Sequence, residues 1–310
     1  MSAATFPTII RNTYRKAFVR CPRSAAYLYE EGLAGSGGTV SIDLHAGAAF
    51  ARGIEVARRA YYTHPQASAP STTRAANAVE AGREALAEAY GDFPCPPGSN
   101  KTRAAMEGAL YFYFEQWPLD APDALRPITM PDGSLSVEQH FSEPIPITHP
   151  ESGAPLSYEG RIDMLGADAD GDVWVVDEKT TGRLGDAWAN QWYLDAGQTG
   201  YVWWARRTLL RHNVVGVEIR GVGIYKTGYG KMEIPILFQP WETERWYEQM
   251  LRDVNEWRAM SVSGVYRHAL DHACALYNSP CAFLPLCKRE NPAALLAQMR
   301  AAANPEEPLP

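Results

Sequence analysis

Two acidic positions and a lysine lie close together in one short segment of the chain. Asp163 ends the sequence GRID, and Asp177 begins the sequence DEKTT after an apolar stretch that contains a turn. Side chains alternate between the two faces of a strand, so Asp177 and Lys179 share one face and Glu178 takes the other. If the two segments pair as a hairpin, Asp163 comes beside Asp177, and two carboxylates and an ammonium meet in one small site.

This set of groups suits chemistry with a divalent metal ion. Mg²⁺ prefers a few carboxylate oxygens and retains several waters. A bound metal activates water and neutralises charge on a phosphate, while a lysine can orient the attacking water or stabilise the transition state. Without a metal, Asp163 and Asp177 would repel each other. The alternative is a solvated hairpin with charged ends. We expect Glu178→Ala to affect the site much less than Asp177→Ala.

The turn between the two segments carries three aspartates around Gly171. An Asp-Gly pair between two apolar runs predicts a β-hairpin. The aspartates are also spaced like those of a calcium-binding loop. However, the twelfth position counted from Asp168 is Lys179, where an EF-hand needs glutamate. We therefore interpret the aspartates as turn residues.

The composition is that of a globular protein with an uneven charge distribution. Hydrophobic residues make up 46% of the 310 residues, so the chain can bury a sizeable core. No apolar window reaches about 18 residues and no secretory signal precedes a cleavage site, so we expect no membrane span and no export. The net charge is −7. Basic clusters nevertheless lie within residues 11–23 and 206–212, and we expect both to contact phosphates.

Hydrophobic periodicity predicts a mixed α/β protein. Helices are predicted at 45–62, 72–90, 101–116, 186–210 and 241–260. Strands are predicted at 136–147, 158–165, 173–179, 214–225 and 231–238. The C-terminal segment 291–310 is rich in alanine and proline, and we expect a mobile tail there.

The order of a glycine, an aspartate and an Asp-x-Lys-Thr segment resembles the nuclease core of the PD-(D/E)XK superfamily. The likeness is to its RecB/Cas4-like branch, which includes phage-encoded members. The residues that carry it are Gly160, Asp163, Asp177, Lys179 and Thr180. Such families also carry Gln-x-x-Tyr on the following helix, and Gln198 and Tyr201 stand at this spacing. An ordinary amphipathic helix with one polar rim residue is the alternative for this segment.

The resemblance implies a restriction-endonuclease-like α/β core, in which helices flank a central mixed sheet. A helical N-terminal insertion and a C-terminal cysteine segment would be added to it. It also implies one nuclease domain over 1–290, with a helical part at about 45–116, a catalytic core at about 136–240 and a cysteine-bearing part at about 241–290. The implied activity is Mg²⁺- or Mn²⁺-dependent hydrolysis of DNA phosphodiester bonds. The implied catalytic residues are Asp163, Asp177, Lys179, Gln198 and Tyr201.

The third metal ligand departs from the family pattern. Many members place a metal-binding histidine four residues after a glycine on an upstream helix, but counting from Gly47 leads to Ala51. Glu55 lies one helical turn beyond, on the same face. We predict that Glu55 is the third ligand beside the two aspartates. A solvated charge at this position is the alternative reading, and Glu107 and Glu138 are alternative ligands.

Four of the five cysteines form a distinctive pattern. Cys274, Cys281 and Cys287 follow one another with gaps of six and five residues, and Cys21 stands near the start. An odd count argues against a disulfide scaffold and fits a reducing cytoplasm. The cysteines could be small buried hydrophobes, zinc ligands or iron–sulfur ligands. Resemblance to Cas4-like and AddB-like nucleases implies a [4Fe–4S] cluster on these four thiolates. Cys95 would not be a ligand of this cluster.

The resemblance implies a stand-alone exonuclease of recombination, repair or phage DNA processing. Its partner would be DNA, in the cytoplasm of a bacterium, an archaeon or a phage-infected host. The chain has no Gly-x₄-Gly-Lys-[Ser/Thr] loop, so a fused ATP motor is not expected. The alternatives are a non-catalytic DNA-binding module and a Cas4-like protein active only with a recombination or integration partner. Four aromatic residues lie near the Gln-x-x-Tyr segment: Trp192, Tyr193, Trp203 and Trp204. We expect most of them to be core residues and some to stack on unpaired bases.

Overall fold

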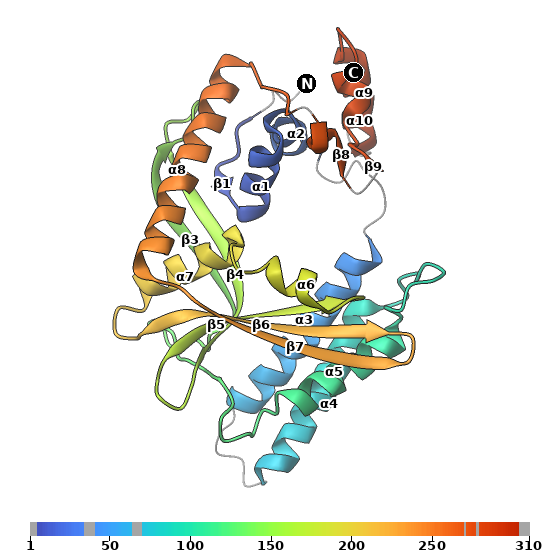
Figure 1. The fold of residues 1–310 in the computed structure, drawn as a ribbon, viewed down its shortest axis with the longest axis vertical. Helices are drawn as coiled ribbons and strands as arrows, with labels where there is room; N and C mark the ends of the chain where they lie inside the picture. Colours follow the sequence, from blue (N-terminus) through green and yellow to red (C-terminus); the bar gives the residue numbers. More distant parts are fainter. Residues whose placement is uncertain (1–4, 34–40, 64–69, 270, 277–278, 304–310) are drawn as a thin grey trace. The chain divides into compact units, whose positions relative to one another are not determined.

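A computed structural model describes residues 5–33, 41–63, 70–269, 271–276 and 279–303 (Figure 1). The chain forms two compact units, and each unit is assembled from segments far apart in the sequence. Unit 1 takes its described residues from Met1–Thr39, Phe141–Gly160 and Arg245–Pro310. Unit 2 takes its described residues from Val40–His140 and Arg161–Glu244. The single nuclease domain expected over 1–290 stays a prediction.

A mixed β-sheet of seven strands forms the centre of the fold. Its strands are β1 (Ile9–Ile10), β2 (Arg126–Pro127), β3 (Val137–Thr148), β4 (Pro155–Ala167), β5 (Val173–Thr181), β6 (Val214–Tyr225) and β7 (Gly228–Leu237). The order is β1-β4-β5-β6-β7, and β2 and β3 also pair with β4. The β4–β5 and β6–β7 pairs are antiparallel, whereas β5 and β6 are parallel. The strands predicted at 158–165, 173–179 and 214–225 are confirmed.

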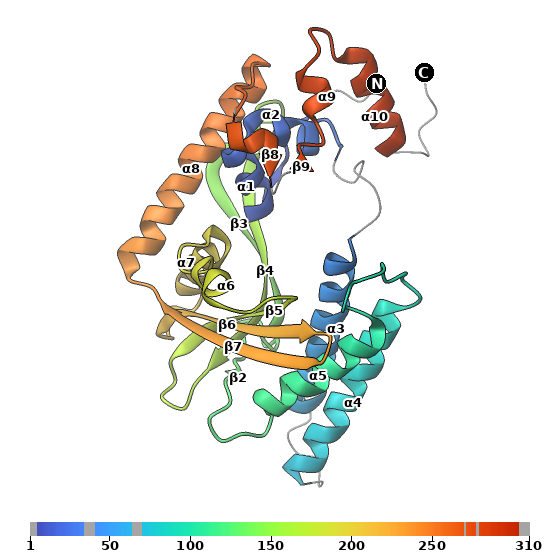
Figure 2. The same ribbon diagram turned by 45° about the vertical axis from the view of Figure 1, so that its right-hand side comes forward.

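Three helices of unit 2 cover one face of β5 and β6. They are α3 (Ile42–Thr63), α4 (Ser71–Tyr90) and α5 (Arg103–Gln116), and they lie together in both ribbon views (Figures 1 and 2). The helices predicted over 45–116 are thus confirmed. Gly82 lets α4 approach α3 closely, since a Cβ there would lie 2.9 Å from the Ala57 Cβ. The shared core contains Phe50, Ile54, Leu86, Met106, Leu110 and Tyr113, together with Val222 and Ile224 of β6.

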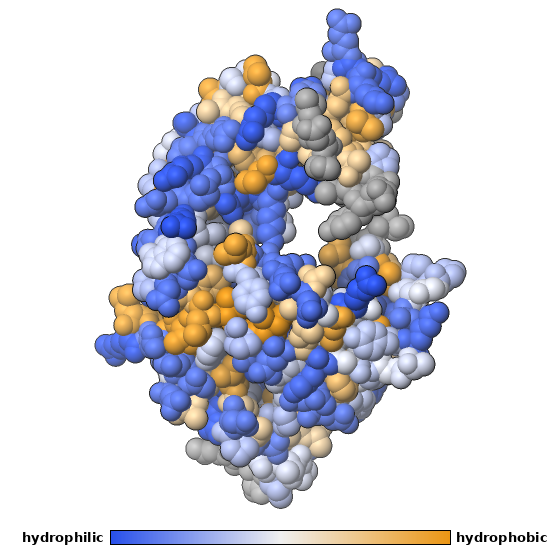
Figure 3. Space-filling view, viewed as in Figure 1, coloured by the Kyte–Doolittle hydropathy of each residue, from blue (hydrophilic) through white to orange (hydrophobic). Residues whose placement is uncertain are grey.

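Two shorter helices replace the single helix predicted over 186–210. They are α6 (Asp186–Asn190) and α7 (Ala196–Thr208). The break occurs because Asp195 starts a new helix: its carboxylate accepts the amides of Gly197 at 2.7 Å and Gln198 at 3.2 Å. The connection through α7 carries the chain between the parallel strands β5 and β6. In the surface view, orange, hydrophobic residues gather where the strands β6 and β7 run in Figure 1 (Figure 3).

Unit 1 contains N-terminal and C-terminal elements. It holds β1, α1 (Asn12–Arg20), α2 (Pro22–Ala25), the π-helix η1 (Ala26–Glu30), most of α8 (Pro240–Ser263), η2 (Asp271–Cys274), β8 (Ala275–Leu276), β9 (Ser279–Pro280), α9 (Leu284–Cys287) and α10 (Ala293–Ala303). Glu30 ties the N-terminal part to α8, since its carboxylate accepts bonds from Trp257 at 2.6 Å and Ser261 at 2.7 Å. Within the described ranges, no helix is both long and apolar enough to span a membrane.

The segment 291–310, which was expected to be a mobile tail, contains the helix α10. Leu295, Leu296 and Met299 are partly buried against a hydrophobic cluster of unit 1. The members of that cluster are Tyr27, Leu33, Phe283 and Leu286. Apolar side chains at helical spacing therefore fix this segment, although its composition resembles that of a linker. Residues 304–310 lie outside the described residues.

Candidate active site

The pairing of β4 with β5 brings the two predicted aspartates together. The antiparallel register runs from Ala167 opposite Val173 to Met164 opposite Val176. Asp163 and Asp177 are the next residues along the two strands. The Glu178 amide donates a 2.9 Å hydrogen bond to Asp163 Oδ2, so the backbone of β5 holds the first carboxylate directly.

Lys179 lies against the second aspartate. Its Nζ is 2.5 Å from Asp177 Oδ2 and also donates to the Glu178 carbonyl at 3.3 Å. Asp177 is only 5% exposed, while the Lys179 side chain is 36% exposed. Burial lowers the pKa of Lys179, but the carboxylates of Asp177 and Asp163 outweigh it and raise that pKa above its ordinary value. The contact with Asp177 thus favours the charged form of Lys179.

The site has more negative than positive charge. Burial raises the pKa of Asp163 well above its ordinary value; Lys179 opposes the shift, whereas Asp177, Glu178 and Glu138 add to it. One ammonium thus faces several carboxylates in a poorly solvated place. A divalent cation would relieve this repulsion and would find the hard oxygen ligands that it prefers. The residues present therefore fit an Mg²⁺ or Mn²⁺ ion.

Among the described residues, two adjacent aspartates, and no larger cluster of ligand side chains, are available to a metal ion at this place. In the part of the chain that the structure describes, no three His, Cys, Asp or Glu side chains are gathered into a group that could hold a metal ion. Mg²⁺ is commonly bound through one or two carboxylates and retains waters, so Asp163 and Asp177 would suffice as protein anchors. A bound ion would activate water and neutralise charge on a phosphate.

Glu55, the predicted third ligand, lies on α3 between two arginines. Its carboxylate contacts Arg52 at 2.7 Å and Arg59 at 3.0 Å. Burial would raise the pKa of Glu55, but these two guanidinium groups lower it below its ordinary value. The negative charge is thus balanced within the helix. A ligand role for Glu55 stays a prediction, and it would require the carboxylate to exchange an arginine for the metal.

The two alternative ligands differ in their surroundings. Glu107 is paired with Arg83 and Arg103 on the surfaces of α4 and α5. Glu138 on β3 is largely buried and paired with Arg161 at 2.9 Å. Its φ of 51° is the one positive value found for a non-glycine residue within the described ranges. Such strained backbones concentrate at functional sites, and Glu138 also raises the pKa of Asp163.

The helix α7 brings Gln198 and Tyr201 to the same region. Burial raises the pKa of Tyr201 to about 12, and the nearby charges of Asp177 and Asp163 add to the shift. Its phenol is thus a hydrogen-bond donor at neutral pH. Gln198 is 4% exposed, and its Oε1 is buried without a hydrogen-bond partner among the described residues. An unsatisfied buried acceptor calls for a partner such as water or a ligand.

Glu178 points to the opposite face of β5, and this face is buried by helices. The Glu178 carboxylate forms an ion pair with Arg58 of α3 and accepts a 3.1 Å bond from Tyr113 of α5. Tyr113 Oη also accepts from Arg58 at 2.8 Å and from Arg220 of β6 at 3.3 Å. The alternation argument placed Glu178 correctly but missed the burial. The charged positions on β6 within an apolar strand were the available signal.

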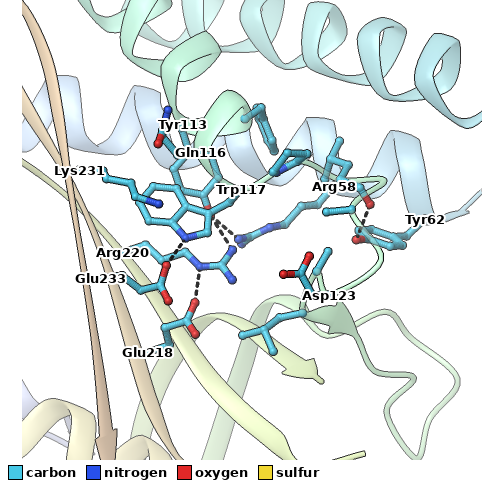
Figure 4. Close-up of a pocket in the computed structure, with 16 residues that line it drawn as sticks. Arg58, Tyr62, Tyr113, Gln116, Trp117, Asp123, Glu218, Arg220, Lys231 and Glu233 are labelled. Carbon is cyan, nitrogen blue, oxygen red and sulfur yellow. Dashed lines mark hydrogen bonds and ion pairs between the residues drawn. The ribbon is translucent and has the colours of Figure 1, made fainter. Parts of the chain in front are cut away.

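A pocket of about 290 Å³ opens beside this buried network (Figure 4). Arg58, Tyr113 and Arg220 line its inner wall, and Trp117 and Lys231 line it as well. Arg220 lies over the Trp117 ring at 5.5 Å from its centroid. Positive and negative side chains are balanced around this pocket, so it does not select for anions.

The basic clusters supply fewer free cations than expected. Arg15 forms a buried ion pair with Asp253 at 2.6 Å within unit 1. Arg206 donates to the carbonyls of Val214 at 2.9 Å and Phe238 at 2.6 Å in unit 2. These two arginines stabilise the fold, and the expectation that they also contact phosphates stays a prediction. Sequence alone does not distinguish such arginines from those on an exposed surface.

Comparison with known proteins identifies the family. The sequence model described as "PD-(D/E)XK nuclease superfamily" matches residues 14–288. The chain belongs to the PD-(D/E)XK nuclease superfamily. The restriction-endonuclease-like α/β fold predicted from sequence is confirmed, and the family implies a nuclease that hydrolyses nucleic acid.

Other comparisons add little detail. A solved structure titled "Crystal structure of SSO0001" is 14% identical, with a TM-score of 0.30; the match covers 81% of this chain and 79% of that one. The search of curated proteins found no match. The RecB/Cas4-like branch and the cysteine cluster therefore remain predictions within the PD-(D/E)XK superfamily.

The buried ion pair predicts a large stability loss for Glu178→Ala. The change leaves the Arg58 guanidinium buried without its carboxylate, which should lower the free energy of unfolding by about 3–5 kcal/mol. Urea unfolding followed by circular dichroism measures the change. Glu84→Ala on the exposed surface of α4 is the control, and it should stay within ~0.5 kcal/mol. A Glu178→Ala protein as stable as this control would contradict the burial of the pair.

The raised pKa of Asp163 predicts that Asp163→Asn stabilises the metal-free protein at neutral pH. The folded state binds this proton more tightly than the unfolded state, so wild-type stability falls as pH rises from the unfolded pKa, about 3.9, through the folded pKa. Asparagine carries no charge, so the variant does not lose stability through ionisation at position 163. Its melting temperature at pH 8 should be higher by ~2 °C or more, and the gain should vanish near pH 4.

Metal provides the control for the Asp163→Asn measurement. Saturating Mn²⁺ should stabilise the wild type more than the variant, since the variant has lost a charged ligand. Scanning calorimetry at both pH values, with and without the ion, measures all these differences. A metal-free variant that melts at or below the wild-type temperature at pH 8 would mean that Asp163 is not held under electrostatic repulsion.

Proposed function

We propose that this protein is a metal-dependent deoxyribonuclease that hydrolyses phosphodiester bonds with Mg²⁺ or Mn²⁺. One observation supports this most directly. Asp163 and Asp177 are adjacent and linked through the Glu178 amide, with the Lys179 ammonium 2.5 Å from Asp177. Membership of the PD-(D/E)XK superfamily fits the same chemistry.

The neighbouring side chains have roles that follow from their charge and protonation. Asp163 and Asp177 would hold the ion, with Glu55 as an additional ligand. Lys179, which stays protonated, would stabilise negative charge on the scissile phosphate or orient the attacking water. The Tyr201 phenol would donate to a phosphate oxygen, and Gln198 would position the strand or the water through its unsatisfied Oε1.

We further propose action at DNA ends, as an exonuclease of recombination, repair or phage DNA processing. The turn before α7 carries Tyr193, half-exposed, and Leu194, 88% exposed. This turn follows α6, whose Trp188 packs over Gly221, the strand partner of Lys179. Aromatic groups beside a nuclease centre can stack on unpaired bases. Among the aromatic side chains considered for stacking, Trp203 and Trp204 are buried in the core.

The four predicted cluster cysteines all belong to unit 1. Cys21, Cys274, Cys281 and Cys287 all line one small pocket. Burial raises the pKa of the Cys287 thiol; Arg23 opposes the shift and the other three thiols add to it. We propose that these thiolates hold a [4Fe–4S] cluster, with Zn²⁺ as the alternative. The cluster would link the N-terminal helices to the C-terminal segment.

An assay on defined DNA substrates tests the proposed reaction. The purified chain is incubated with end-labelled linear DNA and with covalently closed circular DNA, in Mg²⁺, Mn²⁺ or EDTA. We expect metal-dependent loss of the linear substrate, with the circle intact. Cleavage of the circle would show an endonuclease. No cleavage of either substrate would favour a non-catalytic DNA-binding module, or a protein active only with a recombination or integration partner.

Metal analysis of anaerobically purified protein tests the cysteine cluster. We expect a brown protein with about four irons per chain. Cys281→Ser should lower the iron content and the melting temperature, whereas Cys95→Ser should change neither, because Cys95 belongs to unit 2 and does not line the pocket. One zinc per chain in a colourless protein would select the zinc alternative. The absence of both metals would overturn both proposals.

A further inference from the structure

Glu178 belongs to two different sets of contacts. Its backbone amide points toward the neighbouring strand β4 and donates to Asp163 Oδ2 at 2.9 Å. Its carboxylate projects from one face of β5 and binds Arg58 and Tyr113. A single residue therefore connects a catalytic carboxylate to the helices α3 and α5. No other residue of the Asp-x-Lys segment can do this, because Asp177 and Lys179 both project to the catalytic face.

The contacts behind Glu178 form a closed and balanced network. Two guanidinium groups, two carboxylates and one phenol come from α3, α5, β5 and β6. The side chains of Arg58 and Glu178 are 3% and 4% exposed, and those of Arg220 and Glu218 are 8% and 12% exposed. Arg220 contacts Glu218 at 2.6 Å and reaches Tyr113 at 3.3 Å. Each charge has an opposite partner, so the network can remain rigid while buried.

The network around Glu178 lies next to the end of the regular β4–β5 pairing. The register of these strands ends at Met164 opposite Val176, and the next link is the bond from the Glu178 amide to Asp163. At this point two carboxylates that repel each other must remain adjacent. Without a fixed Glu178, this single bond would have to oppose the repulsion between Asp163 and Asp177.

We propose that Arg58, Tyr113 and Glu178 form a clamp that positions Asp163 beside Asp177. These three are positioning residues, since they act through the backbone of β5 and do not face the reacting groups. The clamp rests on the proposed nuclease function for its catalytic consequence. Its structural consequence, a fixed Glu178 amide, can be measured in the metal-free protein.

Two variants separate positioning from mere stability. Arg58→Met/Glu178→Met replaces the buried pair with apolar side chains of similar length, which often preserves stability. Tyr113→Phe keeps the ring in the core and removes the hydroxyl that joins both arginines to Glu178. The matched control is Arg15→Met/Asp253→Met, which removes a comparable buried pair of unit 1 with no backbone link to the catalytic aspartates.

Hydrogen exchange of the Glu178 amide is the first readout, in metal-free protein. We expect exchange about tenfold faster in both clamp variants and unchanged exchange in the control, with all melting temperatures measured alongside. Mn²⁺ binding by calorimetry is the second readout, and it should weaken in the clamp variants alone. In the cleavage assay, kcat should fall about tenfold or more with little change in KM for DNA.

The outcomes distinguish the clamp from the nuclease function. A wild type that cleaves nothing contradicts the proposed function, while amide exchange and Mn²⁺ binding still decide whether the clamp exists. Folded clamp variants with wild-type exchange, Mn²⁺ affinity and kcat would overturn the clamp. If the double variant does not fold, Tyr113→Phe decides the question alone by the same three readouts.

Discussion

The site depends on one constraint: two carboxylates are held side by side, away from bulk water, with one ammonium against the second of them. Asp163 and Asp177 repel each other, and burial makes the repulsion stronger. The fold opposes it with three devices: the register of β4 and β5, the hydrogen bond from the Glu178 amide and the contact of Lys179 with Asp177. Each device leaves the negative charge available to a metal ion.

The two faces of β5 carry side chains with different roles. The face that carries Asp177 and Lys179 is the proposed catalytic face, and Tyr201 of α7 lies near their charges. The opposite face is packed by α3 and α5, whose Arg58 and Tyr113 hold Glu178. Residues 177–179 therefore contain both the proposed catalytic side chains and a side chain, Glu178, that stabilises the fold. Polar groups are buried on both faces. Those around Glu178 are paired with one another, whereas Gln198 Oε1 has no hydrogen-bond partner among the described residues.

Sequence reasoning succeeded where local rules apply and failed where distant contacts decide. Strand alternation and the Asp-Gly turn predicted the hairpin and the faces of β5. The burial of Glu178 was missed, because its partners Arg58 and Tyr113 are far away in sequence. The break between α6 and α7 was missed, because a single cap at Asp195 outweighs a continuous periodic pattern. The packing of α10 and the ion pair of Arg15 depend on tertiary contacts in the same way.

The most direct test of the catalytic centre is the single-turnover cleavage rate of end-labelled DNA in Mn²⁺ for wild type, Asp177→Asn and Asp170→Asn. Asp170 lies exposed on the turn of the same hairpin and provides the matched control. The structure predicts that Asp177→Asn reduces the rate by at least ~10²–10³ while the protein stays folded, and that Asp170→Asn changes nothing. Cleavage by a folded Asp177→Asn protein at the wild-type rate would contradict the assignment of this site.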